Sequence, residues 1–136
     1  MVEYKSYTWS FSDQGARPSQ EDVVFQKKVT ATRENGNKKE VWIVGVADGH
    51  LGAEVSEFLK EYIPTAITPL IINKPPNTND EYLDLEILKS EIIDIVKKAD
   101  DLISQLDYIS IHSCPGAVMS FYVVYGDHIL VFQLGD

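Results

Sequence analysis

The chain has 136 residues, with 12 basic and 21 acidic side chains and a formal net charge of −9. This length corresponds to one domain or less, and a hydrophobic content of 44% is enough to build a core. The acidic balance argues against a nucleic-acid partner, because phosphate neutralisation needs stripes of Lys and Arg. It also argues against docking on an anionic membrane surface.

Two further features of the sequence bear on the compartment. Residues 1–5 lack the apolar core of a secretory signal, and the longest apolar stretch, residues 63–72, is too short to span a bilayer. Cys114 is the single cysteine, so no disulfide can form within the chain. We therefore expect a reducing location, cytoplasmic or nuclear.

The first half of the chain is predicted to form three strands. Aromatic residues alternate with serine and threonine in residues 4–12, a period of two that is typical of a strand. A second strand is expected at about residues 22–31, with a turn signal at Asn35-Gly36 after it. The third strand, residues 41–47, is apolar on both faces, which predicts burial on both sides.

Two helices are predicted after the third strand. The first has an apolar stripe, and Pro64 and Pro69 are expected to limit or kink it. Its stripe residues are Leu51, Val55, Phe58, Leu59 and Tyr62. The second helix is longer, from about residue 80 to residue 106, with apolar residues at spacings of three or four.

The last part of the chain, residues 117–134, is predicted to be a β-hairpin with a turn at Gly126-Asp127. The expected element order is therefore β-β-β-α-α-β-β. Because the strands cluster and do not alternate with helices, this order predicts an α+β fold in which helices lie on an antiparallel sheet.

Hard oxygen ligands are concentrated in two short segments next to strands. One contains Arg17, Glu21 and Asp22, and the other is the tripeptide Asp-Gly-His at residues 48–50. Carboxylates with a free backbone carbonyl suit Mg²⁺ or Mn²⁺, whereas the single cysteine and three scattered histidines show no zinc-ligand spacing. Taken alone, each segment could be an ordinary turn or a solvated pair. Their order along the chain, and their position beside strands, favour a metal site.

These motifs resemble those of the metal-dependent Ser/Thr protein phosphatases of type 2C. Residues 15–22 are similar to the family's first motif, in which Gly-x-Arg leads to Glu-Asp, and residues 46–52 are similar to its Asp-Gly-His signature. Residues 116–117 and 134–136 resemble its Gly-Thr-Ala strand and its Gly-Asp-Ser-Arg motif. The resemblance implies the N-terminal half of an α/β/β/α sandwich, so that residues 1–136 would form a single partial domain, truncated on its C-terminal side.

The resemblance implies metal ligands at named positions. Asp48 would bridge two metal ions, with the Gly49 carbonyl and Glu21 as further ligands. Asp22 would support this site, directly or through water. Asp136 would contribute to an additional metal site.

The resemblance also implies two catalytic residues. Arg17 would hold the substrate phosphate, a task that suits a planar guanidinium. His50 would be the general acid that protonates the leaving serine or threonine oxygen. The implied reaction is hydrolysis of phosphoserine or phosphothreonine in a phosphoprotein by a metal-activated water.

The sequence departs from the family pattern in three places. Leu51 stands where the family often has glycine, and residues 116–119 lack the usual hydroxyl residues. The family's later metal-binding aspartates are not present in the chain, from which we expect weak metal binding and little activity.

Two other interpretations remain open at this point. The same fold serves catalytically inactive adaptors, similar to the TGF-beta-activated kinase binding protein, which bind and activate a protein kinase. An unrelated α+β domain with accidental motifs is the other interpretation.

Half a sandwich would leave unpaired sheet edges, so we also expect a homodimer, with exchange of strands as one arrangement.

Overall fold

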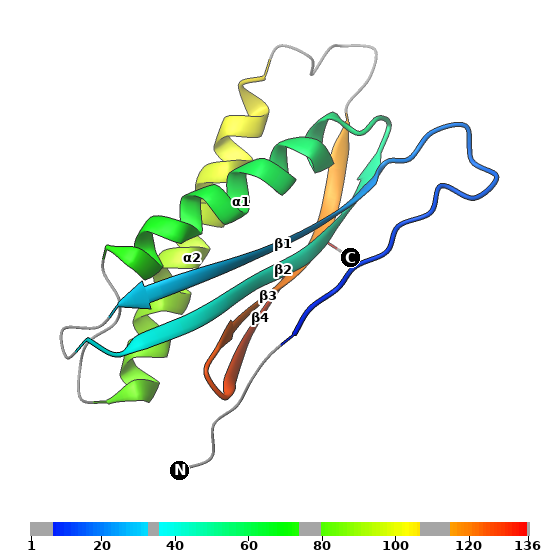
Figure 1. The fold of residues 1–136 in the computed structure, drawn as a ribbon. Coiled ribbons are helices and arrows are strands. Elements are labelled where there is room, and N and C mark those ends of the chain that lie inside the picture. Colours follow the sequence, from blue (N-terminus) through cyan, green and yellow to red (C-terminus); the bar gives the residue numbers. More distant parts are fainter. Residues whose placement is uncertain (1–6, 33–35, 74–79, 107–114, 136) are drawn as a thin grey trace.

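The computed structural model describes residues 7–32, 36–73, 80–106 and 115–135. These residues form four strands and two helices: β1 Asp22–Thr32, β2 Lys38–His50, α1 Glu54–Ile72, α2 Glu81–Ser104, β3 Gly116–Tyr125 and β4 His128–Leu134. The strands form one antiparallel sheet in the order β1-β2-β3-β4. Both helices lie on the same side of this sheet (Figure 1). The predicted α+β class is confirmed.

The strand predicted at residues 4–12 is wrong over its described part, residues 7–12, which form no strand. Their aromatic side chains point into solvent, with Tyr7 75%, Trp9 84% and Phe11 84% exposed. An alternating pattern forms a strand only where a neighbouring strand supplies hydrogen bonds and a surface to pack on. Among the described strands none pairs with this segment, so the observed order is β-β-α-α-β-β.

The sheet has an inner face, covered by the helices, and an outer face on the opposite side. α1 packs on β1, β2 and β3, and α2 packs on α1. Residues 7–10 run along the outer face (Figure 1). With Val24, Val44 and Tyr122 they border an open cavity of about 410 Å³. β2 is therefore buried on one face only, with Val46 42% exposed on the other. The prediction that this strand is buried on both sides is wrong, because the helices cover a single face.

Aromatic rings fill the centre of the inner face, and Gly45 makes room for them. Gly45 lies opposite Phe25 on β1 and opposite Phe121 on β3. A Cβ atom at Gly45 would come within 2.5 Å of Phe25 Cζ and of Phe121 Cβ. Phe121 also stacks on Phe132, with 4.7 Å between the ring centroids. A glycine in the middle of β2 thus allows close packing of rings from three strands.

α1 places an apolar row against the sheet and continues through both of its prolines. The buried row has members four residues apart: Val55, Leu59, Ile63, Ile67 and Ile71. Pro64 and Pro69, which are expected from the sequence to limit or kink the helix, do not limit it, because α1 ends only at Ile72. A proline removes one backbone hydrogen bond, and the burial of Pro64 and its apolar neighbours outweighs that loss.

Leu51 does not join the apolar stripe that was predicted for it. It precedes α1, is 66% exposed and has a φ of 58°. This left-handed conformation costs a residue with a Cβ atom about 1–2 kcal/mol, and glycine adopts it freely. This position in the chain thus favours glycine over leucine.

Leu51→Gly is expected to raise the free energy of unfolding by about 1 kcal/mol, because it removes the left-handed strain at little loss of packing. Urea denaturation followed by circular dichroism measures this change. Leu51→Ala is the matched control, since it removes the same exposed side chain but keeps the strain. An equal gain in both variants would contradict the explanation.

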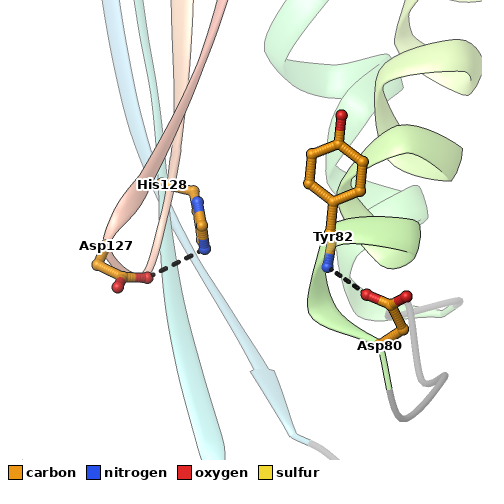
Figure 2. A network of polar contacts seen from close by, with 4 residues as sticks. All are labelled: Asp80, Tyr82, Asp127 and His128. Carbon is orange, nitrogen blue, oxygen red and sulfur yellow. Dashed lines mark hydrogen bonds and ion pairs between the residues drawn. The ribbon is translucent and has the colours of Figure 1, made fainter.

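Polar side chains define the start of α2 and the turn of the hairpin (Figure 2). The Asp80 carboxylate accepts hydrogen bonds from the backbone N–H groups of Tyr82, at 3.0 Å, and Leu83, at 3.2 Å. This caps the helix where the sequence predicted its start. In the predicted turn, Asp127 Oδ1 lies 3.3 Å from His128 Nε2.

Neither of the two described helices is long and apolar enough to cross a membrane.

Candidate functional site

The register of the first two strands brings two carboxylates together at one end of the sheet. Asp22 begins β1 and lies directly opposite Asp48 near the end of β2. Residues opposite each other in an antiparallel pair point to the same face, here the outer face. The two carboxylates therefore lie side by side, close enough for a hydrogen bond between them.

The environment of this pair acts on the pKa of Asp22. The hydrogen bond to Asp48 raises the pKa of Asp22 above 3.8, and partial desolvation and the charge of Asp48 raise it further. Arg17 acts in the opposite direction and lowers it, while Glu21 raises it. A divalent cation could take the place of a proton between two adjacent carboxylates of this kind.

The loop before β1 and this pair together line a partly open cavity of about 270 Å³. Its lining is polar and consists of Asp13, Gln14, Arg17, Pro18, Ser19, Gln20, Glu21, Asp22, Asp48 and Gly49. Local hydrogen bonds shape the loop: Gln14 Nε2 donates to the Arg17 carbonyl at 2.7 Å, and the Gly15 N–H donates to Asp13 Oδ1 at 2.6 Å. Five residues that the sequence predicted for the site therefore line one cavity.

Glu21 and Gly49 are connected through their backbones. The Gly49 N–H donates to the Glu21 carbonyl at 3.1 Å, and the Ser56 hydroxyl donates to the same carbonyl at 2.7 Å. A Cβ atom at Gly49 would lie 2.6 Å from that carbonyl oxygen, so only glycine permits the approach. Sequence reasoning missed Ser56, because a serine in the first turn of a helix carries no distinctive signal.

His50 is not among the residues that line this cavity. Its exposed imidazole lies over Gly116, the residue opposite it in β3. A Cβ atom at Gly116 would overlap His50 Nε2 and lie 2.6 Å from Cε1. The glycine at the start of β3 thus provides the space that the ring of His50 occupies.

Gly116→Ala is expected to displace the His50 ring, because the added methyl group occupies its space. NMR measures this as loss of the contact between the ring Hε1 and the Hα atoms of residue 116, with shifted ring resonances. Ala117→Ser, one residue along the same strand, serves as control and should leave the ring signals in place. Unchanged ring signals in Gly116→Ala would contradict the assignment.

The donor set suits a hard divalent cation. Asp22 and Asp48 offer adjacent carboxylate oxygens, and Glu21 and Gly49 line the same cavity. Oxygen donors of this kind fit Mg²⁺ or Mn²⁺. Within the described ranges, no three His, Cys, Asp or Glu side chains come together as a metal-binding group. The predicted ligand Asp136 lies outside the described residues.

The fold and site define an α+β chain with a polar, carboxylate-lined cavity at one end of an antiparallel sheet. No protein-family model matches the chain, and no curated protein matches it.

Proposed function

We propose that the chain carries the first acidic motifs of a Mg²⁺- or Mn²⁺-dependent protein Ser/Thr phosphatase. The supporting observation is that Asp22, Asp48 and Arg17 line one small polar cavity. Metal-dependent hydrolysis of a phosphate ester uses ligands for a cation and a positive group for the phosphate in the same place. The cavity combines both kinds of side chain. A cytoplasmic or nuclear location belongs to the same proposal.

Each residue has a distinct task in this proposal. Asp22 and Asp48, with Glu21 and the Gly49 carbonyl, would hold the cation. The Arg17 guanidinium would bind the substrate phosphate through two parallel hydrogen bonds. When bound, the cation supplies a water of lowered pKa and neutralises charge on the phosphoryl group. His50, which lies beside the cavity on the same strand as Asp48, would donate a proton to the departing serine or threonine oxygen.

The activity test is hydrolysis of a phosphothreonine peptide at millimolar Mn²⁺. Because the described part of the chain supplies only a small set of carboxylates, we expect slow turnover that EDTA removes and that Asp48→Asn and Arg17→Gln both reduce. Asp127→Asn, in the distant hairpin turn, is the control for the change in charge. Turnover that persists in Asp48→Asn, or that does not depend on the cation, would contradict the proposal.

A kinase-binding adaptor is the alternative function, and the exposed apolar outer face supports it. Val46 is 42% exposed, Tyr122 43%, Ile129 61% and Val131 64%. Apolar surfaces of this kind often serve as protein docking sites. An adaptor would bind and activate a protein kinase equally well with Asp48→Asn, whereas phosphatase turnover would be lost in that variant. The two functions are therefore separable with one substitution.

The chain is expected to form a homodimer, because β1 and β4 each pair on one side only among the described strands. Ile129 and Val131 on the edge strand β4 are exposed and apolar, a combination that favours association. Light scattering at micromolar concentration should give twice the mass of the chain, and Val131→Lys should shift it towards the monomer. A stable compact monomer would contradict this expectation.

A further inference from the structure

The hydroxyl of Ser56 is fully buried in the first turn of α1, with an exposed fraction of 0%. Its Oγ lies 2.7 Å from the Glu21 carbonyl oxygen and 3.0 Å from the Ala53 carbonyl oxygen. A serine hydroxyl has a single hydrogen to donate, so the two carbonyls compete for it. The shorter bond, to Glu21, joins positions 35 residues apart. It therefore connects the helix to the residue that precedes β1.

The Glu21 carbonyl oxygen connects the start of β1 with β2 and with α1. The Gly49 N–H, near the end of β2, donates to the same oxygen at 3.1 Å. A Cβ atom at Gly49 would lie 2.9 Å from Ser56 Oγ as well as 2.6 Å from the Glu21 carbonyl oxygen, so both oxygens approach through the space that glycine leaves. A carbonyl oxygen has two lone pairs, and here both are engaged. Because the carbonyl oxygen of Glu21 is already engaged, only the side-chain carboxylate of this residue remains to bind a cation.

We infer that Ser56 is a positioning residue for the divalent-cation site. By holding the Glu21 carbonyl, it fixes the backbone at the start of β1, from which the Asp22 side chain projects opposite Asp48. Ser56 is not among the residues that line the cavity, so it acts through Glu21 and not by contact with a cation. This inference rests on the proposed function and adds to it a residue that none of the sequence motifs contains.

Removal of this bond is expected to weaken cation binding. Groups that orient the ligands of a metal site typically contribute a factor of about 10 to 100 in affinity. Loss of the Ser56 hydroxyl leaves the Glu21 carbonyl with one partner, so the backbone at the start of β1 gains freedom that cation binding must then remove. We expect the dissociation constant for Mg²⁺ to rise by about tenfold in Ser56→Ala.

The experiment is a Mg²⁺ titration of the ¹⁵N-labelled chain, followed by the amide resonances of Gly49 and Asp22. Thr68→Val is the matched control, because Thr68 Oγ1 also donates to a carbonyl within α1, that of Pro64 at 2.7 Å, but does not contact Glu21. Ser56→Cys provides a second variant that keeps the side-chain volume but donates only weakly. Both Ser56 variants should bind Mg²⁺ more weakly, and Thr68→Val should bind it like the wild type.

The outcomes separate this inference from the proposed function. Equal dissociation constants for wild type, Ser56→Ala and Ser56→Cys would overturn the role of Ser56 and leave the cation site in place. A similar rise in Thr68→Val would also overturn it, because the effect would then follow from the general stability of α1. Absence of saturable binding by the wild type would contradict the proposed cation site itself, and the inference with it.

Discussion

Replacement of Phe121 by alanine is expected to lower the free energy of unfolding by about 3–5 kcal/mol. The ring is 0% exposed, stacks on Phe132 at 4.7 Å between centroids and lies tilted against Phe25 at 6.4 Å. Truncation would remove the contacts of the central ring and leave a cavity between three strands. Urea denaturation followed by tryptophan fluorescence or circular dichroism measures the change.

The control for this prediction is Phe11→Ala, which removes the same side chain from the N-terminal segment. Phe11 is 84% exposed, so its loss should change the stability by no more than about 0.5 kcal/mol. The comparison also tests the fold, because a buried N-terminal strand, as the sequence pattern indicated, would make both variants costly. Similar losses in the two variants would contradict the structure.

Asp48→Asn is expected to have the largest effect on cation binding, with a rise of at least about tenfold in the dissociation constant for Mg²⁺, which corresponds to about 1.4 kcal/mol. Asp48 lies opposite Asp22 and lines the cavity with it, and an amide is a weaker ligand for a hard cation than a carboxylate. Calorimetric or NMR titration measures the constant. Asp127→Asn makes the same change of charge at the hairpin turn and should leave it unaltered.

When no divalent cation is present, Asp48→Asn is expected to stabilise the folded chain at neutral pH. The pKa of Asp22 is raised above 3.8 in the folded chain, first by its hydrogen bond to Asp48. The folded state therefore binds this proton more tightly than the unfolded state does. The stabilisation is complete below pH 3.8 and is lost as the pH rises through the raised pKa of Asp22.

Asp48→Asn removes the neighbouring charge, so the pKa of Asp22 should fall and this loss of stability should disappear. The melting temperature of the variant should exceed that of the wild type at neutral pH, and the difference should vanish in acid. Thermal denaturation over a pH series in EDTA measures it. A difference that is constant with pH would show that the two carboxylates are not coupled.

The hydrophobic pattern of the sequence was sufficient to predict most of the elements. The spacing of apolar residues in 80–106 and the turn at Gly126-Asp127 led to α2 and to the β3–β4 hairpin, close to their observed bounds. These patterns are local, because periodicity and turn residues act within a few positions of the chain. The alternating pattern in residues 4–12 was equally clear but wrongly indicated a strand, because a strand also requires a neighbouring strand to pair with.

The candidate site, like the fold, depends both on local sequence patterns and on the pairing of segments far apart in the chain. That Glu21, Asp22 and Asp48 stand beside strands could be read from the order of residues. That Asp22 lies opposite Asp48 depends on the register between β1 and β2, because a shift of one residue would turn one carboxylate to the other face.

Length, composition and local periodicity thus established a small acidic α+β chain with carboxylates at strand ends. The packing of distant segments established which of these groups meet. His50 lies over Gly116, and Ser56 holds the carbonyl of Glu21. Such contacts join residues far apart in sequence, and their geometry follows from strand register and helix placement, which the spacing of residues along the chain does not specify.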